Sequence, residues 1–436
     1  MRGGVTVRRS GNPVTGESAP VTPEPVGFVS TRRLAGVATA VRAFSRARRG
    51  NSILEPQSGW VRPNFDRFVA IRRFGALDGL RAMSAIAVVW AHTSVTLGPA
   101  VLGVNLFFAI SGFLITSLLL RERTGSGGIS LRKFYARRAL RIFPLYYAML
   151  LVYIVLVAAI RRQSPEGIQF FNCLPAYATY TFNWLTPGNI HVPFSFAWSL
   201  ATEEQFYLLW PPLLVATLTI GGWKRTWPPL VVLALLIAIS QGIGLVGDSS
   251  VMPWRIPASL SLPILLGAAA ALVTSTRLGF AVVSAVVGRV WSAPVAAVLL
   301  VVAIAANAAL QITEILMVVV VVATCIVEWT PLHPILRWRP LAFVGVISYG
   351  VYMLQGLCGD AVRIAIGEQQ RILIFVVTLV TVVVVAYLSF RFFETPVLKL
   401  KRRYETSGEH EGDELSRIAA LSRPEVPQTV CDKGAY

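Results

Sequence analysis

Apolar runs close to the length of a bilayer crossing repeat along this chain from Ala76 to about residue 390. A helix needs about 20 mostly apolar residues to cross a membrane, and in lipid its backbone must be hydrogen-bonded internally. The pattern predicts an all-α, polytopic integral membrane protein with about ten transmembrane helices. The predicted spans are 79–97, 101–120, 142–160, 202–220, 228–246, 256–275, 290–308, 311–328, 341–358 and 372–390.

The composition supports this prediction. Hydrophobic residues make up 55% of the 436 residues and charged residues only 14%, whereas a soluble domain carries about 25% charged residues. The stretch from Arg289 to Glu328 is too long for one crossing, so we divide it near Asn307–Glu314. The net charge of +18 is interpreted as membrane orientation and not as nucleic-acid binding. Four cysteines without CxxC spacing indicate no cysteine-based metal site.

The distribution of Lys and Arg predicts the orientation. With ten crossings and a cytoplasmic N-terminus, the short inner loops hold 13 Lys and Arg, against 5 in the outer loops. The positive-inside rule therefore favours two cytoplasmic termini, with 161–201 as the largest outer segment. We expect a basic, largely disordered leader at 1–75, a membrane domain at 76–398 and a polar tail at 399–436. Residues 31–49 could form a basic helix on an anionic leaflet or stay disordered.

Arg81 and His92 are ionisable residues within the first predicted span, where charge is costly. Eleven residues advance a helix by almost three whole turns, so both side chains share a face, about 16 Å apart along the axis. An imidazole titrates near neutral pH, which suits a general base. A histidine that only packs and hydrogen-bonds is the alternative.

Arg137, Arg138 and Arg141 precede the third span at helical spacing. They are expected to form one stripe at a helix entry. An arginine fork binds phosphate through two parallel hydrogen bonds, so the stripe could hold a phosphorylated cytoplasmic donor. The alternative is a simple positive-inside anchor.

Glu203 and Glu204 begin the predicted fourth span. Thr202 with Gln205 could form a capping box there, and acids suit a helix N-terminus. In the functional interpretation, one carboxylate orients the histidine or holds a sugar hydroxyl.

Other polar residues in the spans have weaker interpretations. In the second span, Gly112 favours close helix packing. In the ninth, Ser348, Tyr352 and Gln355 lie near one helix face. Glu394, at the end of the tenth span, has Arg391 as a possible partner at i,i+3 spacing. No GxSxG, Walker, GxGxxG or HExxH motif occurs.

Five segments together resemble the acyltransferase-3 family of bacterial membrane acyltransferases, which includes O-antigen acetylases and macrolide acyltransferases. The resemblance extends from about Ala76 to Pro396. It rests on LDGLRA with a following histidine at 77–92, GVNLFFAISGFLI at 103–115, FYARRALRIFPLYY at 134–147, WSLATEEQFYLLWP at 198–211 and ISYGVYMLQ at 347–355. The closing FFETP at 392–396 fits as well.

The resemblance implies ten core helices in a bacterial cytoplasmic membrane and transfer of an acyl group from cytoplasmic acyl-CoA. Acetyl-CoA is the expected donor, and no bound cofactor or metal is expected. The acceptor would be a hydroxyl on a carbohydrate, glycolipid or secondary metabolite. It implies catalytic roles for His92, Arg81 and Glu203 and donor binding by Arg138 and Arg141. Ser348 and Tyr352 are added as candidate binding residues.

Two positions depart from the family pattern. Asn105 stands where the family often has an acid, and Gln355 stands where it often has a histidine. Some members also carry a fused extracytoplasmic SGNH hydrolase-like domain, and the short tail predicts none here.

A transporter or flippase of a glycolipid is the alternative function, with Arg81, His92 and Glu203 forming a proton or substrate path. We expect it to need paired repeats and broken helices in matching positions, and the sequence indicates neither.

Overall fold

The structure is a computed structural model that describes residues 63–71, 73–93, 101–185, 192–221, 225–246, 252–367 and 369–401. The predictions for 31–49, for most of the leader and for 402–436 lie outside the described residues. The chain divides into two units, Met1–Trp60 and Val61–Tyr436, and only the second contains described residues. Helices are the only regular secondary structure in those residues, so the predicted all-α class is confirmed.

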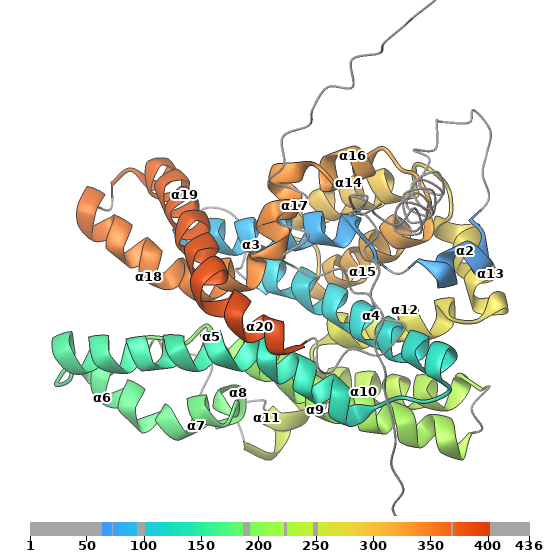
Figure 1. Cartoon of the computed structure of the whole chain (residues 1–436), viewed down its shortest axis with the longest axis horizontal. Coiled ribbons are helices and arrows are strands. Elements are labelled where there is room, and N and C mark those ends of the chain that lie inside the picture. The colour runs from blue at the N-terminus through green and yellow to red at the C-terminus, as the bar shows by residue number, and fades with distance from the viewer. Residues whose placement is uncertain are drawn as a thin grey trace, which may run out of the picture. The chain divides into compact units, whose positions relative to one another are not determined.

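Each predicted apolar run overlaps a long helix (Figure 1). The helices are α3 (Ala76–Thr93), α4 (Val101–Ser126), α5 (Leu131–Ile160), α9 (Ala197–Ile220), α10 (Trp227–Val246), α12 (Leu262–Thr274), α14 (Ser292–Ala305), α15 (Leu310–Ile326), α18 (Ser348–Ile366) and α19 (Arg371–Ser389).

Only some of the long helices meet the length and hydropathy of a membrane crossing. Three helices of the described residues are long and apolar enough to cross a membrane by themselves, namely α4, α5 and the continuous helix Arg371–Lys399. Two bent pairs raise this number to five, and three shorter apolar helices are also present. The protein is therefore membrane-like, and ten crossings with cytoplasmic termini remain a prediction.

Shorter helices join the long ones. They are α2 (Phe65–Ala70), α6 (Pro165–Asn172), α7 (Leu174–Ala178), α8 (Phe182–Leu185), α11 (Met252–Ala258), α13 (Arg277–Val287), α16 (Leu332–Leu336), α17 (Arg339–Val346), the π-helix η1 (Phe390–Glu394) and α20 (Thr395–Lys401). The helix thus continues through the FFETP segment, where Glu394 accepts a hydrogen bond from Ser389 at 3.4 Å.

Two pairs of consecutive helices are sharply bent, which the sequence did not indicate. α12 turns into α13 at 115°, and α17 turns into α18 at 78°. The argument that the chain shows no evident broken helices, which counted against a transporter, is therefore weaker. The predicted division of 290–328 is confirmed, because α14 ends at Ala305 and α15 begins at Leu310. Asn307 makes this turn with a φ of 50°.

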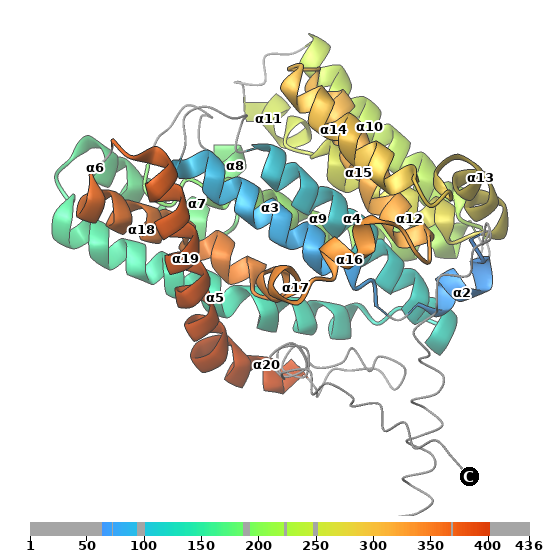
Figure 2. The same ribbon diagram turned by 90° about the horizontal axis from the view of Figure 1, so that it is seen from above.

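Glycines let α4 and α12 pack backbone to backbone, and both views show these helices side by side (Figures 1 and 2). A Cβ at Gly112 would lie 1.9 Å from the carbonyl oxygen of Ile264, and one at Gly267 would lie 2.4 Å from that of Ala109. No side chain fits at such distances. The predicted packing role of Gly112 is confirmed, and the crossing fixes the face that α4 turns toward α5 and α9.

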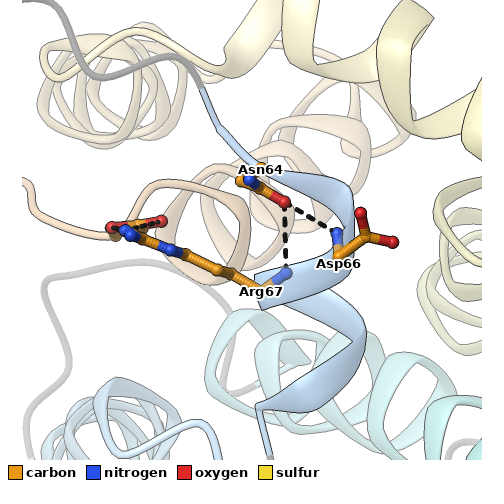
Figure 3. Close-up of polar contacts among 4 residues, drawn as sticks. Asn64, Asp66 and Arg67 are labelled. Carbon is orange, nitrogen blue, oxygen red and sulfur yellow. Dashed lines mark hydrogen bonds and ion pairs between the residues drawn. The ribbon is translucent and has the colours of Figure 1, made fainter.

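The helix α2 is tied down just before α3 begins. The side chain of Asn64 caps it by accepting hydrogen bonds from the backbone N–H groups of Asp66 and Arg67 (Figure 3). Arg67 pairs with Glu328 at 3.0 Å, and Asp66 pairs with Arg277 at 2.8 Å. Because these ion pairs are largely exposed, each contributes little to the free energy of folding. They connect α2 to the residues near α13 and α15.

The segment from α6 to α8 packs along α5 (Figure 1). Tyr146 and Tyr147 of α5 donate hydrogen bonds to the backbone carbonyls of Tyr177 and Ala178, at 2.9 and 3.0 Å. These hydrogen bonds fix the segment from α6 to α8, part of the predicted outer segment, onto α5, the helix that carries Arg138 and Arg141.

Candidate active site

Five helices, α3, α4, α5, α9 and α18, line one cavity. Its charged and hydroxyl-bearing lining residues are Arg81, Ser111, Arg138, Arg141, Ser199, Glu203, Glu204, Tyr207, Ser348, Tyr349 and Tyr352. The structure thus brings together every predicted site residue except His92. A cavity with convergent polar and charged groups is the usual form of a small-molecule site.

The arginines reach this cavity because α5 begins earlier than predicted. Ser130 caps the helix by accepting a hydrogen bond from the Lys133 N–H, and the helix runs from Leu131. The apolar span predicted at 142–160 is the later part of this helix, and the arginines expected at a helix entry lie in its first three turns. Arg138 and Arg141 are one turn apart inside the helix and both line the cavity.

Arg137 is not part of this pair. Its guanidinium lies 3.5 Å from the Glu122 carboxylate of α4, and both side chains are almost entirely buried. The predicted stripe of three arginines is therefore wrong. One arginine joins α5 to α4, and the other two face the cavity.

The guanidinium N–H groups of Arg138 have no hydrogen-bond acceptor among the described residues. Its guanidinium carbon lies 5.1 Å from the ring centroid of Tyr207 and 5.9 Å from that of Phe134. Besides these cation–π contacts, Arg138 interacts electrostatically with the carboxyl group of Glu204. Among the described residues it forms no hydrogen bond or ion pair. A guanidinium held over rings at a cavity is available to bind an anion.

The two glutamates lie inside α9 and do not cap it. The helix begins at Ala197, so the predicted start at residue 202 and the capping box are wrong. Thr202 donates to the carbonyl of Trp198 at 3.1 Å, and Gln205 donates to the carbonyl of Tyr180 at 2.7 Å. The first turn consists of residues 197–200, and the polar residues at 202–205 could not reveal it.

Glu203 is held by two hydroxyl groups. Its Oε1 accepts hydrogen bonds from Ser111 of α4 and from Tyr207, one turn further along α9. Sequence reasoning assigned no role to Tyr207, although its i,i+4 spacing from Glu203 was a usable signal. The role of Ser111 depends on how α4 packs against α9, which the sequence does not encode locally.

Ser348 and Tyr352 reach the cavity from the first turns of α18, just after the bend. The Tyr352 hydroxyl bonds with Ser199, and it also donates to the carbonyl of Phe196 at 3.1 Å. Tyr352 therefore joins α18 to the start of α9.

Tyr180 brings the predicted outer segment close to the cavity. It adopts a φ of 55°, and its ring stacks on Tyr146 at 4.3 Å. Burial raises the pKa of Tyr180, and the neighbouring Tyr349 and Glu204 raise it further. The phenol therefore stays protonated, and its buried hydroxyl has no hydrogen-bond partner in the described residues.

Arg81 and His92 lie at opposite ends of α3. Arg81 lies 3.5 Å from Asp78 and lines the cavity. His92 is exposed in the last described turn, and the continuation of the span to residue 97 lies outside the described residues. His92 is not among the described residues that line the cavity, whereas Arg81 and Glu203 are. Eleven residues of helix separate His92 from Arg81, which corresponds to about 16 Å along the axis.

The contacts of His92 define its tautomer. Its Nδ1 lies 2.8 Å from the carbonyl oxygen of Val88. A carbonyl only accepts, so Nδ1 carries the hydrogen, and in the neutral ring Nε2 keeps a free lone pair. Arg363 of α18 donates to the backbone carbonyl of His92 and pairs with Asp360 at 3.1 Å. The last turn of α3 is thereby joined to α18.

A family model for an acyltransferase domain matches residues 74–391. The chain belongs to the acyltransferase-3 family. It is 26% identical over 365 residues to the peptidoglycan O-acetyltransferase OatA of Listeria monocytogenes, a match that covers 74% of this chain and 56% of that protein. It is 27% identical over 376 residues to the O-acetyltransferase OatA of Staphylococcus aureus, which covers 77% of this chain and 58% of that protein.

The chain spans between half and two thirds of the length of these relatives. No solved structure matches the chain. The expectation of an acyltransferase enzyme is confirmed at the level of the family.

Asn105 stands where the acyltransferase-3 family often has an acid, and an acidic side chain from another helix lies next to it. Asn105 donates from Nδ2 to Oε1 of Glu314 on α15, at 2.8 Å, and both side chains are buried. A carboxyl group is thus present here, supplied by another helix. Gln355 is also buried, and its Nε2 has no partner within the described ranges. In those same ranges, no three His, Cys, Asp or Glu side chains come together as a metal site.

Proposed function

We propose that this protein is an integral-membrane O-acyltransferase that moves an acyl group from cytoplasmic acyl-CoA to a hydroxyl of a cell-envelope carbohydrate. The observation that carries the proposal is the cavity between α3, α4, α5, α9 and α18, where Arg138 offers an uncommitted guanidinium beside Arg141. Because both OatA relatives are named O-acetyltransferases and one is named for peptidoglycan, acetyl-CoA and peptidoglycan are the first donor and acceptor to test.

The donor would bind through its phosphates. Arginine forks form short, charge-assisted hydrogen bonds to phosphate oxygens. Arg138 and Arg141 face the cavity from adjacent turns of one helix, so they can neutralise neighbouring phosphates. Arg81 adds a third positive group to the lining. Ser348 and Tyr352 would supply hydroxyl groups for substrate binding.

The base would be His92. Its Nε2 would take the proton of the acceptor hydroxyl while that oxygen attacks the thioester carbonyl. The carbon–sulfur bond would then break, and the imidazolium would give this proton to the departing sulfur, which releases CoA as a thiol. Acyl-CoA carries its phosphates and its thioester at opposite ends of a long arm. One donor molecule can therefore bind at the arginines and react at a histidine about 16 Å from Arg81 along α3.

This arrangement requires a defined orientation. The start of α5 and the end of α4 would face the cytoplasm, and α6 would face outward. Cysteines introduced at Ser126 and Ile168, both exposed, should react with a membrane-impermeant reagent from opposite sides. The native cysteines at 173, 325 and 358 are buried, and Cys431, which lies outside the described residues, is replaced by serine in the labelled protein. Reaction of both introduced cysteines from one side contradicts the orientation.

The activity itself can be tested with purified protein in detergent. Acetyl-CoA carrying a labelled acetyl group is incubated with soluble peptidoglycan fragments, and mass spectrometry detects an added acetyl mass on the glycan. The matched control is the His92→Gln variant. If wild-type protein acylates neither peptidoglycan fragments nor other envelope glycans and glycolipids, the proposal is wrong.

One observation favours a second candidate, transport of a glycolipid. The bent pairs α12–α13 and α17–α18 resemble the discontinuous helices that transporters use at their binding sites. Liposomes containing the protein and a fluorescent glycolipid separate the two functions. A transporter moves the lipid between leaflets without acyl-CoA, whereas the proposed enzyme modifies its acceptor only when acyl-CoA is present.

A further inference from the structure

Tyr207 occupies a special place among the cavity residues. It lies on α9 one turn after Glu203, is almost entirely buried and lines the cavity. Its hydroxyl donates to Glu203, and its ring lies beneath the guanidinium of Arg138, 5.1 Å from the ring centroid. One side chain thus contacts both a cavity carboxylate and a cavity arginine through different parts of its structure.

The hydroxyl end of Tyr207 is fixed from two helices. The oxygen of Glu203 that accepts its hydrogen bond also accepts one from Ser111 of α4. The ring of Tyr207 therefore cannot rotate away from α5 without breaking a hydrogen bond in a buried site, where an unpaired polar group is costly.

The ring is, in turn, one of two supports of Arg138. Phe134, on the same helix as Arg138, is the other, at 5.9 Å. With no hydrogen bond or ion pair to a described residue, the long side chain of Arg138 would otherwise sample many rotamers. A fixed aromatic surface limits this freedom before any ligand arrives and leaves the N–H groups unoccupied.

We infer that Tyr207 is a positioning residue for the donor, and that Glu203 and Ser111 act through it by holding its ring under Arg138. The inference rests on the proposed function, in which Arg138 binds the phosphates of acyl-CoA. It assigns Glu203 to the donor arginine, and not to the orientation of His92. Donor affinity, and not the chemical step, is then the quantity that these residues control.

The experiment compares Tyr207→Leu, Tyr207→Phe and Ser111→Ala in the full-length purified protein. The dissociation constant of CoA, KM for acetyl-CoA and kcat are measured for each variant. Tyr207→Leu removes ring and hydroxyl and should raise the CoA dissociation constant and KM roughly threefold to thirtyfold, the range of a partly desolvated cation–π contact. Tyr207→Phe and Ser111→Ala keep the ring and should have smaller effects, and kcat should change less than twofold in all three.

A double-mutant cycle with Arg138→Ala gives the decisive result. If Tyr207 acts through Arg138, Tyr207→Leu should weaken CoA binding in the wild-type background and have almost no further effect once Arg138 is alanine. Equal effects in both backgrounds, or a fall in kcat with unchanged KM, overturn the inference. Should Tyr207→Leu fail to fold, Tyr207→Phe in the same cycle gives the answer on a smaller scale.

The same data separate this inference from the proposed function. If Arg138→Ala itself binds CoA normally, the proposed donor site is wrong. If Arg138→Ala weakens CoA binding but Tyr207→Leu does not, the donor site stands and the positioning role of Tyr207 is wrong. Thermal melting of each variant in detergent shows whether a change in binding reflects loss of fold.

Discussion

The five helices around the cavity differ from α10, α12, α14 and α15 in what their sequences specify. All cavity-lining residues among the described residues belong to α3, α4, α5, α9 and α18, and none comes from the other four helices. The five motif segments that resemble the acyltransferase-3 family lie on those same five helices. The other four helices have apolar runs and no motif.

The two regions therefore place different demands on the sequence. In α10, α12, α14 and α15, many apolar residues would satisfy the same requirement, because the helices need only length, hydropathy and small residues at crossings. Around the cavity, specific side chains are required at specific turns. A substitution there should change chemistry, whereas one in the apolar region should change stability, and the predictions below test that division.

The largest expected effect is that of His92→Gln. Glutamine keeps a hydrogen-bonding group of similar size but cannot take up the proton of an acceptor hydroxyl. Loss of a general base lowers the rate by about 10²–10⁴, so acyl transfer should fall at least about a hundredfold while CoA binding stays normal. Turnover and CoA affinity of the purified variant are measured side by side. Near-normal turnover would remove His92 as the base.

Donor binding comes next in size. Arg138→Ala or Arg141→Ala should weaken CoA binding about tenfold to a hundredfold, because each loses charge-assisted hydrogen bonds of about 1.5–3 kcal/mol. Lysine at either position should restore binding only in part, since it lacks the planar fork. The matched control is Arg289→Ala, an exposed arginine next to α14. If all three alanine variants bind CoA equally, the arginines of α5 are only topology anchors.

These positions also show how far sequence reasoning reached. It placed Arg81, Arg138, Arg141, Glu203, Ser348 and Tyr352 at the site, and they do line one cavity. It expected the arginines of α5 at a helix entry but did not give the first residue of that helix, Leu131, because the first turns mix basic and aromatic residues. It also missed the bends after α12 and α17, since a bend depends on what packs against the helix and not on its hydropathy.

Side-chain partners from distant segments were hidden for the same reason. Ser111 and Glu203 are 92 residues apart, and Asn105 and Glu314 are 209 residues apart. No local pattern links such pairs. Arg81 and His92 are the opposite situation, because their spacing correctly placed both on one helix. The spacing could not show that, of the two, only Arg81 lines the cavity.

The Asn105–Glu314 pair connects the two regions, since α4 lines the cavity and α15 does not. Asn105→Ala leaves the Glu314 carboxyl buried without the hydrogen bond it accepts at 2.8 Å. The cost should be about 1–3 kcal/mol of stability. Thermal melting in detergent measures it, and Glu314→Gln is the companion variant because it keeps an acceptor oxygen for Asn105. If Asn105→Ala melts normally but loses turnover, the pair belongs to the chemistry of the cavity and the division between the regions is wrong.

The smallest effect tests the apolar region alone. Val321 of α15 is fully buried, whereas Val301 of α14 is 65% exposed. Val321→Ala removes two methyl groups from a packed interior and should cost about 1–2 kcal/mol, because the neighbours close the space only in part. Val301→Ala should cost almost nothing. Neither should alter kcat or KM for acetyl-CoA, since α14 and α15 contribute no residue to the cavity lining that the described residues form. Melting temperature and steady-state kinetics are measured on both variants. A change in kcat for Val321→Ala without a change in melting would mean that packing in α15 is coupled to catalysis, and the two regions would then have to be treated as one functional unit.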